Sequence, residues 1–559
     1  MIVVYSFVVC NFYVLPMKKL VPLLLLLAIA CKQEDYNADL LVKNAVVYTV
    51  DNNFRVADAF VVRRGKIVAV GKTDSLEEKY AAREVVDAGG KPVFPGFIDA
   101  HAHFYQYGLG LQEVNLDNTH SWQEVIDSIN VYARKNPEGW IIGRGWDQNK
   151  WPVKQFPNKA ELDSMFPVRP VLLTRVDGHA MIVNQEALNL AGIKPGQTIS
   201  GGQIETINGK LTGILVDNAQ ALVRRKVPAP SDQDTQAALL GAQQNCFAVG
   251  LTTVDDCGLP YTMINIIAEL QHKGELKMRM YVMLSDNRDN YDYLFKRGVY
   301  KTPGLDVRAF KLYADGALGS RGACLLQPYT DKKGWRGFLL SDPKHFEQVA
   351  RMLAGKGFQM CTHAIGDSAN RMMLKIYAAA LKGKNDRRWR IEHAQVLSPD
   401  DIKYFGNYNI IPSVQPTHAT SDMYWAGARL GKQRLKTSYA NKQLLAQNGW
   451  LPLGTDFPVE NINPIYTFYA AFARKDLKGY PDGGFQPENA LSRKEALQGM
   501  TIWAARANFE EKEKGSIEPG KYADFVILDK DIMKINTADV PQVKVLKTYI
   551  NGEKVYEKK

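Results

Sequence analysis

The 559-residue sequence predicts an α/β fold: a (β/α)8 TIM barrel with a large insertion after strand 1, plus a small β-sandwich domain built from both termini. Three observations predict it. Short apolar runs alternate with amphipathic stretches through the middle of the chain. The residue pattern at both ends of the chain is typical of short strands. One connection between two predicted strands is too long to be a single helix. With 46% hydrophobic and 23% charged residues, the composition is that of a globular protein with a large core.

Short strands separated by tight turns occupy both ends of the mature chain. Residues 38–90 contain β-type runs such as Lys66–Val70, and residues 505–559 show the same pattern, with runs such as Asp524–Leu528. We therefore expect one β-sandwich domain made of these two parts. It flanks a barrel at residues 91–504.

The middle of the chain carries the barrel pattern. Amphipathic helices are expected at His345–Lys356 and Ser368–Leu381, and the step at about residues 110–245 is long enough to be an insertion. Eight apolar runs are the expected barrel strands: Val93–Asp99, Leu251–Asp255, Met278–Leu284, Ala309–Tyr313, Phe358–His363, Trp389–His393, Ile410–Val414 and Leu451–Asp456.

The N-terminal 30 residues have the pattern of a secretory signal peptide of the lipoprotein type. Lys18 and Lys19 precede a short apolar run that ends at Cys31, the residue that would carry a lipid anchor, and residues 31–37 form a polar tether. Another type of signal or membrane anchor is the alternative, although Leu20–Ala30 is too short to span a bilayer. We expect a protein of the bacterial cell envelope, anchored on the periplasmic or cell-surface side, with Met1 or Met17 as its start.

Charge and motifs exclude several functions. The net charge of +11 is spread in short Lys/Arg pairs with no basic tail, so we expect no nucleic-acid partner. Neither a Gly-x-Ser-x-Gly elbow nor a nucleotide-binding glycine motif is present, which disfavours serine hydrolases and nucleotide cofactors. The four cysteines after residue 31 lack the spacing of a disulfide framework and are expected to be free thiols.

Metal-binding residue types stand at the ends of five predicted strands. His101 and His103 follow the first strand and, being two residues apart, point to the same side. Lys311, His363, His393 and Asp456 end or lie near the ends of later strands. Each has an ordinary structural explanation alone, but the carboxyl ends of barrel strands form the catalytic face. We therefore interpret the six residues as one metal-binding group.

In this order the residues resemble the amidohydrolase superfamily of metal-dependent hydrolases, and more closely its amidohydrolase-3 branch, which includes N-substituted formamide deformylase. The resemblance covers nearly all of residues 38–559. The matching stretches are Pro95–His103, Asp177–Ala180, Asp315–Gly319, His363–Asp367, Ile391–Ala394, Gly454–Pro458 and Gly515–Val526.

The resemblance implies a divalent-metal site, usually with two zinc ions. His101, His103 and Asp456 would bind one ion. His363 and His393 would bind the other, with Lys311 bridging both as its CO2-derived carbamate. A hydroxide activated by the metals would attack the substrate carbonyl, while Asp456 acts as general base and then general acid. The expected enzyme cleaves a C–N bond of a small amide, formamide or cyclic amide.

Five further residues are candidates for substrate binding, and several questions stay open. His179, Trp146 and Asp147 lie in the insertion, whereas Arg321 follows strand four and His418 follows strand seven. A deaminase or another carbonyl-type hydrolase on the same barrel is an alternative, as is a lipid-anchored binding protein with an inactive site. The substrate, the metal and the oligomeric state, a homo-oligomer included, are not determined by the sequence.

Overall fold

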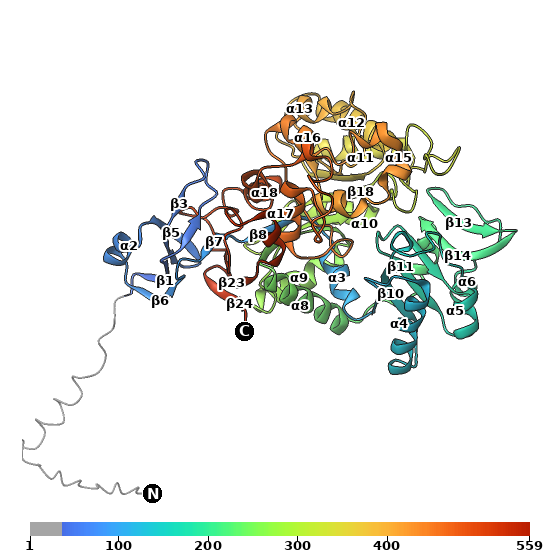
Figure 1. Ribbon diagram of the computed structural model, residues 1–559, viewed down its shortest axis with the longest axis horizontal. Helices are drawn as coiled ribbons and strands as arrows, with labels where there is room; N and C mark the ends of the chain where they lie inside the picture. The colour runs from blue at the N-terminus through green and yellow to red at the C-terminus, as the bar shows by residue number, and fades with distance from the viewer. Residues whose placement is uncertain (1–35) are drawn as a thin grey trace, which may run out of the picture.

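The structure is a computed structural model that describes residues 36–559 (Figure 1). The predicted signal peptide at residues 1–30, the lipid-anchor site Cys31 and nearly all of the tether lie outside the described residues. Over residues 36–559, no helix combines the length and apolar character needed to cross a bilayer.

The centre of the molecule is the predicted parallel barrel. Its strands pair in the spatial order β21-β20-β19-β18-β16-β15-β8, and the short β17 (Tyr300–Lys301) pairs antiparallel with β18. The TIM-barrel prediction is confirmed. The seven parallel strands are β8 (Phe97–Ala102), β15 (Leu251–Leu259), β16 (Arg279–Ser285), β18 (Leu305–Tyr313), β19 (Gln359–Ala364), β20 (Arg390–His393) and β21 (Ile411–Ser413).

The eighth predicted strand, Leu451–Asp456, is an extended segment rather than a regular strand, and it still closes the barrel. On one side the Gly454 N–H donates to the Val414 carbonyl oxygen at 3.1 Å, and on the other the Asp456 N–H donates to His101 at 2.7 Å. Asp456 has a φ of +64°, which interrupts the β conformation. The segment therefore bends and turns the Asp456 side chain into the barrel mouth.

The first predicted strand, Val93–Asp99, is two strands rather than one. It divides at Gly96, where β7 (Pro92–Pro95) of the β domain ends and the barrel strand β8 begins. A Cβ atom on Gly96 would lie 2.2 Å from Thr252 Oγ1, so only glycine lets the chain pass between the two sheets here. The apolar run is continuous because both strands are buried.

The β domain combines both ends of the chain, as the sequence predicts. Phe60 from the N-terminal part packs edge-on against Phe525 from the C-terminal part, which stacks on Tyr549 at a centroid distance of 4.3 Å. Figure 1 shows the blue N-terminal strands beside the red C-terminal ones. One sheet has the order β5 (Lys66–Gly71), β4 (Ala59–Arg63), β1 (Ala38–Lys43), β6 (Ala82–Asp87), and the other β24 (Glu553–Glu557), β23 (Val545–Ile550), β22 (Phe525–Leu528), β7, β2 (Val46–Tyr48), β3 (Val56–Ala57).

The insertion after β8 has a sheet and a hydrophobic core of its own (Figure 1). α8 (Asp232–Ala248), further along, packs on α3 (Phe104–Gly110) and on β15, so it covers the barrel. The sheet has the order β13 (Gly202–Ile207), β14 (Lys210–Asp217), β12 (Ala180–Val183), β11 (Val171–Arg175), β10 (Ile141–Trp146), β9 (Val114–Asn115), with helices α4 (Trp122–Lys135), α5 (Ala160–Met165), α6 (Gln185–Ala191) and α7 (Gln220–Arg224).

Helices cover the outside of the barrel. α11 (Pro343–Lys356) shows why they form: the Asp342 side chain caps its first turn, proline occupies its first position, and Gly357 ends it in the left-handed conformation. The remaining helices of the barrel region are α9 (Thr262–His272), α10 (Arg288–Arg297), α12 (Asp367–Leu381), α13 (Lys403–Tyr408), α14 (Pro416–Asp422), α15 (Ala426–Leu435), α16 (Asn441–Asn448), α17 (Pro464–Ala473), α18 (Arg493–Gly499) and α19 (Ile502–Ala507). Of these, α14 lies at the barrel mouth, and α2 (Thr73–Lys79) lies in the β domain.

Candidate metal centre and substrate cavity

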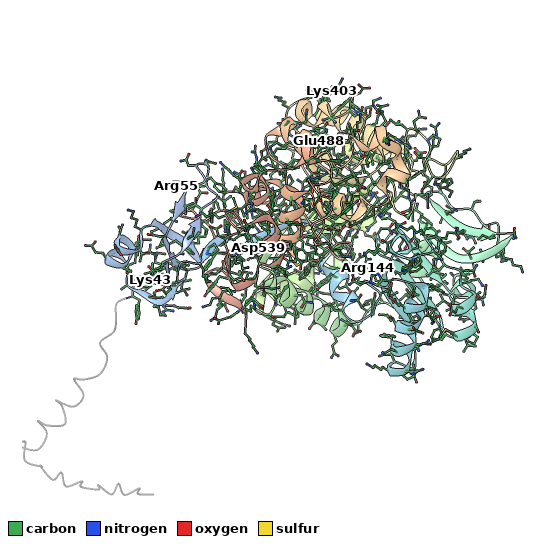
Figure 2. All side chains as sticks on the ribbon, in the orientation of Figure 1. Lys43, Arg55, Arg144, Lys403, Glu488 and Asp539 are labelled. Carbon is green, nitrogen blue, oxygen red and sulfur yellow. The ribbon has the colours of Figure 1, made fainter. Side chains whose placement is uncertain are left out.

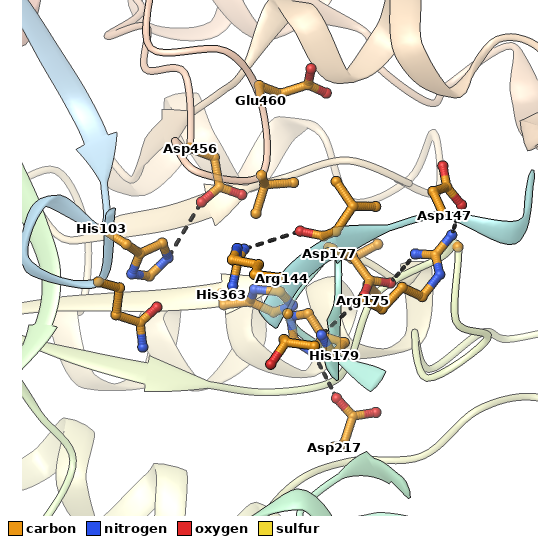
Figure 3. Close-up of a pocket in the computed structure, with 18 of the residues that line it drawn as sticks. His103, Arg144, Asp147, Arg175, Asp177, His179, Asp217, His363, Asp456 and Glu460 are labelled. Carbon is orange, nitrogen blue, oxygen red and sulfur yellow. Dashed lines mark hydrogen bonds and ion pairs between the residues drawn. The ribbon is translucent and has the colours of Figure 1, made fainter. Parts of the chain in front are cut away.

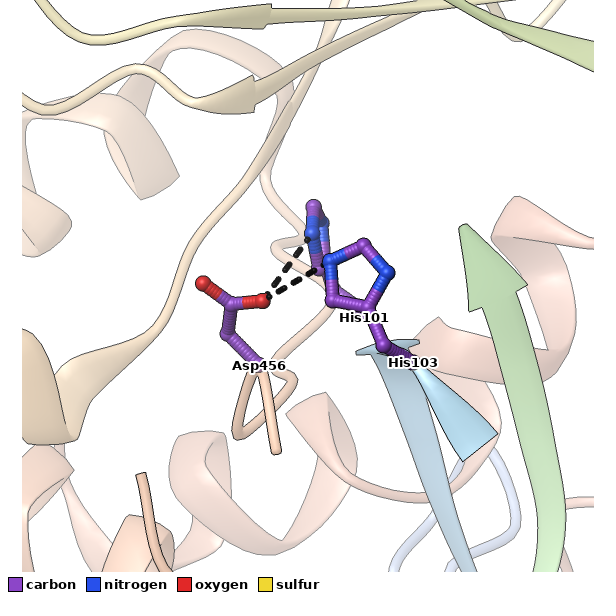
Figure 4. A group of neighbouring side chains, drawn as sticks. All are labelled: His101, His103 and Asp456. Carbon is purple, nitrogen blue, oxygen red and sulfur yellow. Dashed lines mark ion pairs between the residues drawn. The ribbon is translucent and has the colours of Figure 1, made fainter. Parts of the chain in front are cut away.

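The carboxyl end of β8 brings two histidines to Asp456. The Nε2 atoms of His101 and His103 lie 3.5 and 3.3 Å from the same oxygen of Asp456, Oδ1 (Figure 4). Asp99 fixes this arrangement, because its carboxylate accepts N–H bonds from both His101 and Thr455. The first strand and the closing segment of the barrel are thereby tied together at the site.

The orientation of His101 is set by a buried carboxylate. Glu392, from β20, lies 2.6 Å from Nδ1 of His101, and both side chains are fully buried. A carboxylate accepts a proton but does not donate one when ionised, so Nδ1 carries the hydrogen and Nε2 presents its lone pair to Asp456. This is the tautomer that a metal ligand needs.

A second pair of histidines stands next to the first. The rings of His363 and His393 lie 4.5 Å apart, and the ring of His101 lies 4.8 Å from that of His393. Gln415 holds Nδ1 of His393 at 2.7 Å, which leaves its Nε2 free. Lys311 reaches between these groups from β18, with its Nζ 3.3 Å from Nε2 of His101.

The charge states of the histidines and of Asp456 suit a cation. Burial lowers the pKa of His103 to about 4 and moves the pKa values of His363 and His393 well below the ordinary value, so the three rings are neutral at pH 7. Burial would raise the pKa of Asp456, but the neighbouring histidines hold it well below its usual range. Burial likewise opposes a charge on Lys311, yet Tyr313 and other neighbours raise the pKa of that amine.

The residues present fit a divalent metal. A buried atom at the centre of the group, Oδ1 of Asp456, has no hydrogen-bond partner within residues 36–559. Nε2 of His363 also lacks one there, and Oδ1 of Asp315 lies 3.8 Å from it. Such atoms are costly unless a ligand satisfies them. His101, His103 and Asp456 offer ligand atoms within 4.8 Å of one another, and so do His393, His418 and Asp456. Neutral imidazole nitrogens with a carboxylate oxygen are a donor set that zinc accepts.

His418, the residue predicted near strand seven, holds the other side of Asp456. Its Nε2 lies 3.2 Å from Asp456 Oδ2 and its Nδ1 lies 3.0 Å from Glu460. Burial opposes its charge, but these two carboxylates raise the pKa of His418 to about 10. His418 is therefore protonated and serves as a donor rather than a ligand. Glu460 was not predicted; its only sequence signal is its position four residues after Asp456.

A cavity of about 490 Å³ opens from this group toward the insertion (Figure 3). His179 lines it from the insertion side, with Nδ1 2.6 Å from Asp217 and its ring 5.0 Å from that of His363. Asp147 also lines it and forms an ion pair with Arg175. The barrel and the insertion thus share one cavity, of a size that fits a small organic ligand.

Comparison with known proteins agrees with this geometry. The model of the amidohydrolase family matches residues 84–556, which is most of the chain. The chain belongs to the amidohydrolase family. It is therefore an enzyme of the class that hydrolyses carbon–nitrogen bonds other than peptide bonds, and its metal dependence is shared with its relatives. The prediction of an amidohydrolase is confirmed.

Three relatives span nearly the whole of this amidohydrolase. The protein LONG AFTER FAR-RED 3 of Arabidopsis thaliana is 34% identical and covers 93% of this chain and 92% of its own. The N-substituted formamide deformylase of Arthrobacter pascens is 28% identical, with 93% and 98% coverage. The crystal structure of an uncharacterized metal-dependent hydrolase from Pyrococcus horikoshii is 26% identical, with a TM-score of 0.73 and coverage of 89% and 99%.

Two of the predicted substrate residues lie away from the cavity of this amidohydrolase. The register of β10 shifts between Arg144 and Trp146, and Gly145 between them has a φ of +116°. Arg144 therefore faces the cavity, while Trp146 turns into the core of the insertion and donates to the Leu173 carbonyl at 2.9 Å. Arg321 forms an ion pair with Asp331 at 2.8 Å.

Proposed function

We propose that this amidohydrolase cleaves an amide, formamide or cyclic amide bond of a small molecule with two zinc ions. His101, His103 and Asp456 would hold one ion. His363 and His393 would hold the second, and Lys311 would bridge both as a carbamate. The observation that carries the proposal is the convergence of the Nε2 atoms of His101 and His103 on Asp456 Oδ1, a buried atom without a hydrogen-bond partner in the described chain. The deformylase relative supports the bond type.

The surroundings of Lys311 support its carboxylation. The side chain is 1% exposed, and it forms no ion pair with a carboxylate in the described part of the chain. As a free amine it would carry a positive charge beside His101, where it would oppose a divalent cation. The carbamate replaces this cation with an anion that offers two oxygen atoms. Carboxylation therefore removes the conflict between Lys311 and a metal.

Asp456 is placed to carry the proton of the reaction. The metals, when bound, would polarise the substrate carbonyl and make a water molecule acidic. Asp456 accepts the proton that the attacking water loses and passes it to the nitrogen as the C–N bond breaks, which yields an acid and an amine. His418 donates to the outer oxygen of Asp456 and keeps it ionised. The insertion, with His179, lines the same cavity as Asp456.

Metal content of the full chain tests this proposal. We expect about two zinc ions per chain by elemental mass spectrometry and a sharp fall in Lys311→Ala, partly restored by formate, which replaces the carbamate oxygens. The exposed Lys344→Ala is the control. A panel of amides, formamides and cyclic amides is then assayed for product, and release of ammonia from an exocyclic amine identifies the deaminase alternative. A chain that binds no zinc after incubation with zinc and bicarbonate contradicts the proposal.

We also propose that Cys31 is lipidated and anchors the enzyme in the bacterial envelope. The basic pair Lys18 and Lys19, the apolar run and the cysteine support it. Metabolic labelling with a radioactive fatty acid in a bacterial host tests it. We expect label in the wild type and none in Cys31→Ser, and equal labelling of the two contradicts the anchor.

A further inference from the structure

Two arginines of the insertion lie on the wall of the catalytic cavity. Arg144 comes from β10 and Arg224 from the end of α7, and both line the cavity together with His103 and Asp456. Figure 2 shows Arg144 where the insertion meets the barrel. Arg144 is half-buried, whereas Arg224 is exposed. Both side chains are therefore within reach of a ligand bound at the candidate metal centre.

Neutral groups hold both guanidinium ions. Arg144 donates to the Val176 carbonyl at 3.0 Å, and its Nε is buried without a hydrogen-bond partner in the described chain. Arg224 donates to the hydroxyl of Thr174 at 3.1 Å and to Gln220 at 3.4 Å, both through one nitrogen, Nη2. These contacts orient the two guanidinium groups without neutralising their charge, and each keeps N–H donors for a further acceptor.

The lack of a carboxylate partner sets the two apart from the arginine beside them. Arg175 on the neighbouring strand pairs with both Asp147 and Asp177, the latter at 2.6 Å. Neither Arg144 nor Arg224 has a carboxylate within the 4.0 Å of an ion pair, as far as residues 36–559 show. The two guanidinium groups lie near enough for their positive charges to repel each other. An anion between them would relieve this repulsion.

The acids near the pair are bound by other residues or form no ion pair with it. Glu113, Asp117, Asp177 and Asp456 are near enough to influence the pKa of Arg144. Asp177 is bound by Arg175, and Asp456 by histidines. Glu113 and Asp117 form no ion pair with either arginine. Free cationic donors beside a catalytic centre are a recurring means of recognising a substrate anion.

We propose that Arg144 and Arg224 bind a carboxylate group of the substrate, so that this amidohydrolase acts on amides that bear a carboxylate away from the bond to be cleaved. The inference rests on the proposed function for the reaction, while the anion site itself rests on the two arginines. A carboxylate offers two oxygens in a plane, which matches the planar donors of a guanidinium. A neutral substrate would leave these donors unpaired and would be bound less tightly.

Two matched pairs of compounds test the inference. N-formylphenylalanine and the neutral N-formylphenylalaninol are compared as substrates by release of formate. The inert 3-phenylpropanoate and 3-phenylpropanol are compared by calorimetry on the metal-loaded enzyme. We expect a preference for the carboxylate in both pairs, and a ten- to hundredfold rise in its KM or Kd in Arg144→Gln and Arg224→Gln, with the neutral compound unchanged.

The controls separate this site from folding and from the chemistry. Arg225→Gln changes a neighbouring exposed arginine outside the cavity and should have no effect. Arg144→Lys keeps the charge and should retain part of the preference. Equal binding of the carboxylate and the alcohol, no binding of either, or a preference that survives both Gln variants overturns the inference. Arginine-dependent binding of phenylpropanoate without hydrolysis of any amide would instead reject the proposed reaction and keep the anion site.

Discussion

Replacing Glu392 with glutamine should weaken metal binding, although Glu392 is not itself a proposed metal ligand. The carboxylate is fully buried, with one oxygen 2.6 Å from Nδ1 of His101 and the other 4.0 Å from a nitrogen of Arg390. The side-chain amide of the Glu392→Gln variant can keep its oxygen on His101 only by turning its NH2 group toward the guanidinium of Arg390. Two hydrogen-bond donors would then face each other, which is unfavourable. Turned the other way, the amide donates to Nδ1 and moves the ring hydrogen to Nε2, which then has no lone pair for a metal.

The size of the effect follows from either orientation. Exchanging a charge-assisted hydrogen bond for a neutral one loses about 1–2 kcal/mol. Groups that orient a metal-binding histidine contribute about ten- to a hundredfold in affinity. We therefore expect Glu392→Gln to bind zinc roughly ten- to a hundredfold more weakly than the wild type.

Chelator competition measures this affinity, with elemental mass spectrometry for occupancy and circular dichroism for the fold. Glu347→Gln is the matched control, because Glu347 lies on the exposed face of α11 and pairs with Arg351 at 3.6 Å, away from the metal centre. A folded Glu392→Gln protein that retains zinc as tightly as the wild type would refute the argument that Glu392 sets the tautomer of His101.

Three other predictions concern catalysis, pH and the insertion. Asp456→Asn should lower kcat about a hundredfold or more by removing the proton acceptor, and a steady-state assay on the best substrate found checks this. Burial raises the pKa of Asp256 to about 7, so between about pH 4 and 7 the folded chain binds a proton that the unfolded chain has lost. As the pH rises through that range, the stability of the wild type should fall relative to that of Asp256→Asn, whose side chain stays uncharged. Tm values of the two proteins that run parallel from pH 5 to 8 contradict this prediction. Trp146→Phe leaves the Leu173 carbonyl without its partner and should lower the free energy of unfolding by about 1–3 kcal/mol. Denaturant titration measures that change, and a changed zinc content in the same variant would contradict our placement of Trp146 in the insertion core.

Much of the barrel and of the candidate centre was predictable from the sequence. The His-x-His pair projects to one side because side chains alternate along a strand, and parallel strands place all their carboxyl ends on one face. Local pattern therefore brings His101, His103, Lys311 and His363 to the same mouth. Local pattern alone does not show where a strand breaks. Gly96 divides the first apolar run because two sheets meet there, and Asp456 leaves the β conformation to reach its partners.

The insertion and the neighbours of the centre depended on tertiary structure. Arg144, Arg224 and Asp217 belong to no motif, and their place on the cavity wall results from docking a second sheet against the barrel mouth. The register shift at Gly145 places Arg144, which was not predicted, on the cavity wall in place of the predicted Trp146. The residue types and their order along the chain thus determined the family, the barrel and the candidate metal-binding set, because strand geometry is local. Which side chains line the cavity was decided only by packing between segments distant in sequence.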